Sequence, residues 1–153
     1  IEKIVEDHHK FVRVTSKHAK QIGNVNALLK DLKKRYKIGL LSNCIHKEIN
    51  VLLKSSGIEK KLFDYIIGKE DVRRSKPCPD EIFKVEHLAH LKADYMVGDS
   101  IYDIMAAKKA GVKSISVLTG LAIRKELLMY KPDYILKSVN GLIRLLKKID
   151  NSE

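Results

Sequence analysis

Long apolar runs are absent from this 153-residue sequence, and cysteine is scarce. No run approaches the roughly 18 apolar residues that a membrane-spanning helix needs, so we predict no membrane span. The first residues lack the charged-then-apolar layout of a secretory signal. The cysteines, Cys44 and Cys78, form no CxxC pair and make a poor disulfide framework, as is typical of a reducing compartment. We therefore expect a cytoplasmic protein.

Acidic residues are outnumbered by basic ones. The sequence has 30 lysines and arginines against 19 aspartates and glutamates, a formal net charge of +11. This excess suits an anionic partner, such as nucleic acid, an anionic membrane or a small phosphorylated substrate. The basic residues are spread over short tracts without the aromatic interleaving of a nucleic-acid-binding arm, so we interpret most of them as solvated helix faces.

Short apolar runs alternate with amphipathic segments along the chain, whose length suits one domain. Strands are expected at residues 37–43, 64–68, 94–98, 113–119 and 132–136, and helices at 1–20, 25–36, 46–56, 81–91, 122–130 and 138–149. Asn24 and Asp80 are the expected N-caps, and Gly57 is the expected left-handed C-cap. This alternation implies βαβ units and an α/β domain with a mostly parallel sheet.

The stretch Ala93–Gly111 carries the most informative acidic residues. Asp99 follows a short apolar strand, and Asp103 lies four residues later, in the first turn of an Ala-rich helix that ends at Gly111. Two carboxylates, a helix start and several backbone N–H groups are thereby placed at one rim of an open sheet, where α/β domains bind ligands. Such a rim suits a divalent cation, a phosphate, or both.

Three strand ends are expected to bring polar residues to this rim, because the carboxyl ends of parallel strands point the same way. Ser42 and Asn43 follow one strand, Lys76 lies in the loop after the next, and Asp99 and Asp103 follow a third. The lysine would neutralise phosphate oxygens, the hydroxyl group would hydrogen-bond them, and the carboxylates would suit Mg²⁺. Together these groups can hold a phosphate and a magnesium ion.

Each of these signals also has a purely structural interpretation. Ser100 and Asp103 match the capping-box pattern, so the pair could simply start a helix. Ser42 and Asn43 could cap the following helix, and Lys76 could be a solvated loop lysine. These alternatives stay open at the level of single residues.

The histidines and cysteines give weaker signals. His87 and His90 are spaced i, i+3 without a third metal ligand nearby, so we interpret them as part of an exposed helix face. Cys44 and Cys78 both belong near the rim, where a redox-sensitive pairing is the alternative to two ordinary thiols.

Three segments together resemble a known family. LLSN at 40–43, SKPCPD at 75–80 and VGDSIYDIMAAKKAG at 97–111 are similar to the second, third and fourth motifs of the haloacid dehalogenase superfamily of phosphohydrolases. The resemblance covers about residues 22–120 and is phosphoglycolate-phosphatase-like. It implies a Rossmann-like, three-layer αβα core, a Mg²⁺ cofactor and a small phosphorylated substrate.

The resemblance also implies residue roles. In such enzymes a Mg²⁺-bound aspartate attacks phosphorus, and water then hydrolyses the aspartyl-phosphate. By position, Ser42 would bind the transferring phosphoryl group with Asn43 beside it, and Lys76 would stabilise its charge. Asp99 would bind Mg²⁺, and Asp103 would support the metal site or Lys76.

The family's first motif, a DxD that supplies the nucleophile and the acid/base, has no counterpart in these 153 residues. In such folds its strand lies between the strands that end at Ser42 and at Asp99, so its absence would leave a gap with unpaired backbone groups. We therefore expect that a preceding segment belongs to the parent protein, that residues 1–21 are the remnant of a helical cap, and that residues 22–153 form the core.

The sequence thus favours a Mg²⁺-dependent phosphatase in the full-length parent, with this chain alone inactive. The first alternative is a non-catalytic relative that keeps the phosphate and Mg²⁺ pocket for binding or for a protein partner. A basic nucleic-acid-binding protein is a third interpretation, for which the sequence has no recognised motif. The sequence indicates neither the substrate nor an oligomeric state.

Overall fold

The computed structural model describes residues 23–120 and 122–152. The helix expected at residues 1–20 and the proposed cap remnant lie outside the described residues. No helix of the described part is long and apolar enough to cross a membrane. The helices are α2 (Val25–Leu32), α3 (His46–Ser56), α4 (Asp80–Ala89), α5 (Ile101–Ala110), α6 (Arg124–Met129) and α7 (Leu142–Asp150). The strands are β1 (Gly39–Leu41), β2 (Tyr65–Ile67), β3 (Tyr95–Gly98), β4 (Lys113–Val117) and β5 (Tyr134–Leu136).

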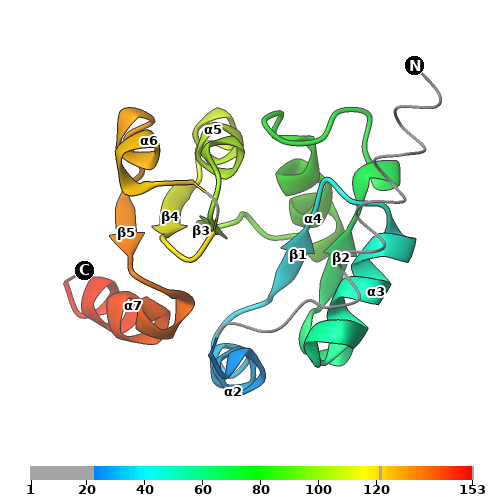
Figure 1. Cartoon of the computed structure of the whole chain (residues 1–153), viewed down its shortest axis with the longest axis horizontal. Helices are drawn as coiled ribbons and strands as arrows, with labels where there is room; N and C mark the ends of the chain where they lie inside the picture. Colours follow the sequence, from blue (N-terminus) through cyan, green and yellow to red (C-terminus); the bar gives the residue numbers. More distant parts are fainter. Residues whose placement is uncertain (1–22, 121, 153) are drawn as a thin grey trace.

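The strands form two parallel sheets, and helices alternate with them as expected for an α/β fold. One sheet pairs β1 with β2, and the other has the order β3-β4-β5. Figure 1 shows the two-stranded sheet with α3 and α4 in one half of the molecule, and the three-stranded sheet with α5, α6 and α7 in the other. The α/β class predicted from the alternation is confirmed, although the sheet is divided in two within the described residues.

Local signals place several helix ends where the sequence predicts them, although α2 ends at Leu32, short of the expected residue 36, and α7 begins at Leu142, after the expected residue 138. The side chain of Asn24 accepts a hydrogen bond from the Ala27 N–H at the start of α2. Gly57 and Gly111 end α3 and α5 with φ of 72°, a left-handed conformation that glycine adopts without the strain of a Cβ.

The expectation that Asp80 caps α4 is wrong. The N-cap is Pro79, and Asp80 is the first residue of the helix. Its carboxylate instead accepts hydrogen bonds from the guanidinium of Arg74 at 3.0 and 3.3 Å. Because Arg74 binds this carboxylate, the Asp80 side chain does not accept a hydrogen bond from the first backbone N–H groups of α4. The helix also ends at Ala89, since His90 adopts a left-handed conformation with φ of 52°.

The three-stranded sheet is covered on both faces. Met96 of β3 packs in a cluster with Ala106 and Ala107 of α5, whereas Ile115 of β4 packs with Leu142 and Leu146 of α7. Adjacent residues of β3 point to opposite faces, and Val97 accordingly joins the cluster of α7. Helices α5 and α7 therefore lie on opposite faces, which gives this half of the molecule the three-layer αβα arrangement.

Asp64, just before β2, ties the two-stranded sheet to α2. Its carboxylate accepts from the Lys33 ammonium and from the Ile38 N–H, both at 2.8 Å. Burial alone would raise the pKa of Asp64, but these two donors outweigh it and hold the pKa below its ordinary value. The charged form is therefore favoured by the folded state.

Strands β1 and β3 turn backbone groups toward each other across the division between the sheets. The N–H of Ser42, the residue after β1, donates to the Ile67 carbonyl of β2. Even-numbered residues in this stretch therefore direct their backbone N–H and C=O groups toward β2. Because backbone direction alternates along a strand, Gly39 and Leu41 direct their N–H and C=O groups away from β2. By the same alternation, Val97 directs its groups away from β4. Both strands are thus edges of their sheets.

Candidate functional site

The Lys76 side chain joins the two halves of the molecule at the carboxyl ends of β1 and β3. Its ammonium donates to Asp103 Oδ1 at 2.8 Å and to the Leu41 carbonyl at 3.2 Å. The side chains of Lys76 and Asp103 are only 12% and 9% exposed. The ammonium is therefore held as a shielded positive charge at the rim. The alternative interpretation of Lys76 as a solvated loop lysine is wrong.

Asn43 fixes the backbone of the loop that carries Lys76. Its side-chain amide donates to the Lys76 carbonyl at 3.0 Å, and its side-chain oxygen accepts from the Lys76 N–H at 3.1 Å. The preceding residue, Ser42, accepts from the Cys44 N–H at 3.1 Å through its hydroxyl oxygen. Neither residue caps α3, whose N-cap is Ile45. Both side chains therefore belong to the rim.

Asp103 combines the capping role with the contact to Lys76. Its Oδ2 accepts from the Ser100 N–H at 3.1 Å and from the Ser100 hydroxyl at 2.8 Å, while Oδ1 accepts from Lys76. A Cβ at Gly98 would lie 2.2 Å from Asp103 Oδ2, so this carboxylate requires a glycine at the end of β3. The capping box of the sequence is present, and the same carboxylate orients the lysine.

Asp99 lies at the end of β3 with an exposed side chain. Its carboxylate approaches Gly120, where a Cβ would be 1.8 Å from Oδ2. This close approach between the β3 end and the loop after β4 had no signal in the sequence. Within the described residues, the Asp99 carboxylate forms no hydrogen bond or ion pair.

Magnesium requires more oxygen ligands than the described residues bring together. No group of three or more histidine, cysteine, aspartate or glutamate side chains in the described part of the chain could hold a metal ion. Asp99 fits as one carboxylate ligand, whereas both oxygens of Asp103 are engaged by Lys76 and Ser100. The residues present therefore make part of a magnesium site.

Glu81 is a further carboxyl group near the rim that sequence reasoning missed. It is the second residue of α4, and it is 0% exposed. Burial raises the pKa of Glu81 above its usual value, and the Lys76 ammonium partly opposes that effect. An acidic residue in a first helical turn usually indicates only a favourable helix dipole, so no sequence pattern indicates the burial of Glu81.

The remaining candidates do not form a site in the structure. The rings of His87 and His90 have centroids 6.4 Å apart, and no third ligand joins them among the described residues. Cys44 and Cys78 are free, partly exposed thiols. The exposed-face interpretation of the histidines agrees with this arrangement, while the redox pairing of the cysteines stays a prediction.

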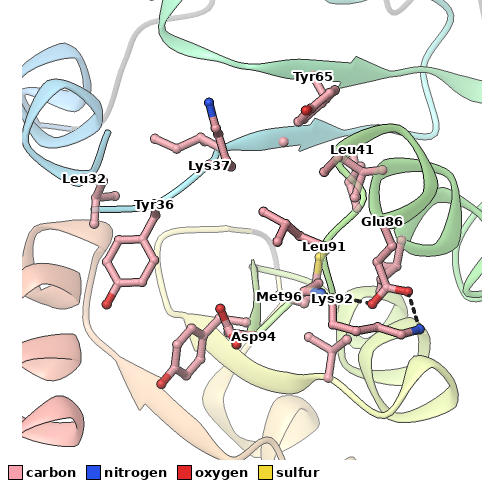
Figure 2. A pocket seen from close by; sticks show the side chains of 18 of the residues that line it. Leu32, Tyr36, Lys37, Leu41, Tyr65, Glu86, Leu91, Lys92, Asp94 and Met96 are labelled. Carbon is pink, nitrogen blue, oxygen red and sulfur yellow. Dashed lines mark hydrogen bonds and ion pairs between the residues drawn. The ribbon is translucent and has the colours of Figure 1, made fainter. Parts of the chain in front are cut away.

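A cavity of about 350 Å³ separates β1 from β3. Side chains from both sheets border it, and Figure 2 shows Leu41 of β1 and Met96 of β3 around the same space, with Tyr36 and Asp94 at another part of its wall. Most of the lining is apolar, and the edges of both strands face it. A cavity of this shape offers backbone donors and acceptors on two opposite sides.

Comparisons with known proteins agree on one family. The family model described as "Haloacid dehalogenase-like hydrolase" matches residues 1–117. Pyrophosphatase PpaX of Bacillus mycoides is 34% identical over 125 residues, which are 80% of this chain and 58% of that protein. Pyrophosphatase PpaX of Bacillus cereus is 30% identical over 149 residues, which are 95% of this chain and 66% of that protein. The chain therefore spans about three-fifths of the length of these curated relatives.

Solved structures show the same fold. A predicted phosphoglycolate phosphatase from Haemophilus somnus superposes with a TM-score of 0.73 at 27% identity, over 81% of this chain and 56% of that one. A haloacid dehalogenase-like protein from Agrobacterium tumefaciens superposes with a TM-score of 0.80 at 19% identity, over 98% of this chain and 71% of that one. The second comparison bears on the fold alone.

Proposed function

This chain belongs to the haloacid dehalogenase-like hydrolase family, and from that premise we propose that the complete protein is a phosphatase acting on a small phosphorylated molecule. The relatives named as pyrophosphatases and phosphoglycolate phosphatases support a phosphorylated substrate. The net charge of +11 is compatible with an anionic substrate.

The Lys76 ammonium, held between Asp103 and the Leu41 carbonyl, is the observation that carries the proposal. A lysine that is 12% exposed and oriented by two oxygens is a preorganised positive charge. It would stabilise the negative charge of a phosphoryl group during transfer. Ser42 would hydrogen-bond the phosphoryl oxygens, and Asn43 would keep the lysine loop in place.

Asp99 is the described residue that suits Mg²⁺, because its carboxylate lies at the rim without another partner in the described chain. When bound, Mg²⁺ would neutralise charge on the phosphoryl oxygens. The role of Asp103 follows its contacts, and we assign it to orienting Lys76. The further metal ligands would come from outside the described residues.

The residues that make and break the bond to phosphorus are proposed to lie in a part of the protein beyond this sequence. No D-x-D occurs in the 153 residues. The cavity between β1 and β3 supports this step, because an extended segment there would run beside the edge of β1 on one side and the edge of β3 on the other. The carboxyl end of such a parallel strand would reach the rim beside Lys76.

The test uses the full-length protein and a generic aryl phosphate. With Mg²⁺ it should release phosphate, and Asp99→Ala should abolish the release because a metal ligand is lost. Asp31→Ala is the matched control, since that aspartate is half-exposed on α2 and forms its ion pair with Lys34 among the described residues. Full activity in Asp99→Ala would exclude the metal role, and a wild-type protein that releases no phosphate would refute the proposed activity.

A second candidate is a non-catalytic relative that uses the same pocket to bind phosphate and Mg²⁺ or a protein partner. It is favoured by one observation, the lack of a D-x-D pattern in these residues. The discriminating fact is whether the gene encodes that pattern upstream of Ile1. Its presence supports the phosphatase, and its absence supports the binding protein.

A further inference from the structure

Gly120, in the loop after β4, lies against the side chain of Asp99. A Cβ built at Gly120 would have Oδ2, Cγ and Cβ of Asp99 as its nearest atoms, all within 2.5 Å. Nonbonded carbon atoms pack at roughly 3.5–4.0 Å, so such a Cβ and the Asp99 side chain cannot both occupy these positions. The Asp99 side chain therefore fills the space that any other residue at position 120 would need for its own side chain.

The backbone conformation of Gly120 does not itself require glycine. A glycine in a loop is usually explained by a left-handed conformation or by the close approach of other atoms. The described glycines with positive φ are Gly23, Gly57 and Gly111, and Gly120 is not among them. The close approach of Asp99 is therefore the reason that the structure gives for a glycine at this position.

Asp99 differs from Asp103 in what holds its carboxylate. Asp103 also fits against a glycine, Gly98, but hydrogen-bond donors hold both of its oxygens as well. The Asp99 side chain is exposed, and it forms no hydrogen bond or ion pair within the described residues. In that part of the molecule, its contact with the backbone of Gly120 is therefore what limits its direction.

The loop that carries Gly120 is anchored where it leaves the sheet. Strand β4 pairs with β3 on one side and with β5 on the other. Directly after β4, the Leu118 N–H donates to the Leu136 carbonyl of β5 at 3.0 Å. Because the chain two residues before Gly120 is fixed to β5, the loop backbone can act as a firm support for the Asp99 side chain.

We propose that Gly120 is a positioning residue for Asp99, which keeps the carboxylate in the direction needed for Mg²⁺ and acts on the ion only through that carboxylate. The inference rests on the proposed function, in which Asp99 is a Mg²⁺ ligand, and it adds the loop after β4 to that site. A ligand that packing already holds in place loses less freedom when the ion binds. Because Mg²⁺ demands a near-ideal arrangement of its oxygen ligands, a displaced carboxylate would bind it more weakly.

The test measures Mg²⁺ binding to the full-length protein by calorimetry, without substrate. Gly120→Ala adds one methyl group, which must displace the Asp99 side chain or the loop. This variant should weaken Mg²⁺ binding about 10-fold, the usual size of the effect when a residue that orients a metal ligand is changed. Gly120→Ser should weaken it to a similar extent, because serine carries the same Cβ.

Gly141→Ala is the matched control. It adds the same methyl group at a glycine with φ of −79°, where the nearest atom to the new Cβ is in the Leu136 side chain at 3.3 Å. The affinity for Mg²⁺ should be unchanged in this variant.

A second measurement uses the unmutated protein and so does not depend on the folding of a variant. The backbone N–H signal of Gly120, assigned by NMR in the isotope-labelled full-length protein, should shift on titration with Mg²⁺, because the ion would bind the carboxylate beside it. The signal of Gly141 should not shift. An unmoved Gly120 signal would overturn the inference.

Wild-type affinity for Mg²⁺ in Gly120→Ala would also overturn the inference, and a lower Tm in that variant would then indicate a structural role alone. Asp99→Ala is measured in the same series, so that a failure of the proposed metal role can be told apart. If the wild-type protein binds no Mg²⁺, or if Asp99→Ala binds it equally well, that role fails and this inference fails with it. Weakened binding in Asp99→Ala with normal binding in Gly120→Ala removes this inference alone.

Discussion

The ion pair between Lys76 and Asp103 gives a prediction whose size follows from the structure. The two side chains are 12% and 9% exposed, and their charged atoms are 2.8 Å apart. Lys76→Met should lower the free energy of unfolding by about 3 kcal/mol, because it leaves a nearly buried carboxylate without its counter-charge. Asp103→Asn should cost less, since the amide keeps an oxygen that can accept from Ser100.

The double variant Lys76→Met/Asp103→Asn removes both charges and so avoids the unpaired group. Its loss should be smaller than the sum of the single losses, with a coupling free energy of about 2 kcal/mol. Urea denaturation of the full-length protein and its three variants measures this coupling, provided that the m-values agree. Additive losses, within about 0.5 kcal/mol, would contradict the reasoning that these charges stabilise each other.

Three further perturbations test other parts of the site and the fold. Gly98→Ala should lower the free energy of unfolding by about 1–3 kcal/mol and reduce activity, because the new Cβ would displace the Asp103 carboxylate, and both losses are measurable by denaturation and phosphate release. Asn43→Ala should cost about 1 kcal/mol and lower kcat, because two hydrogen bonds to the loop of Lys76 are lost; an unchanged kcat would contradict this. Asp64 has a lowered pKa in the folded state, so the stability it contributes is present above the unfolded pKa of about 3.9 and is lost as pH falls through the folded pKa. Asp64→Asn should therefore make the free energy of unfolding fall less steeply with decreasing pH, as measured by denaturation at several acidic pH values.

Much of the fold follows from local sequence signals. The cap of Asn24 and the left-handed glycine Gly57 are short-range features, and they mark the start of α2 and the end of α3 at the predicted residues. The capping pattern of Ser100 and Asp103 is equally local. The error at Asp80 has a non-local origin, because Arg74 reaches across the loop and takes the carboxylate that would have capped the helix.

The site was predictable as a set of residues and not as a set of contacts. The rule that parallel strands end at one rim is enough to bring Lys76 near Asp103. It does not show that Asn43 clamps the loop backbone, that Asp99 lies against Gly120, or that Glu81 is buried. Those facts depend on how loops distant in the sequence pack together, which neither periodicity nor capping patterns encode.

Phosphate release by the full-length protein, measured beside release by the 153-residue chain, tests whether a phosphatase site is completed by residues outside this sequence. Both would be assayed with the same aryl phosphate and Mg²⁺ at equal concentration. We expect release by the full-length protein and none by the chain alone, which holds Lys76 and Asp99 but lacks a D-x-D nucleophile. Equal release by the two proteins, or none by the full-length protein, would contradict it.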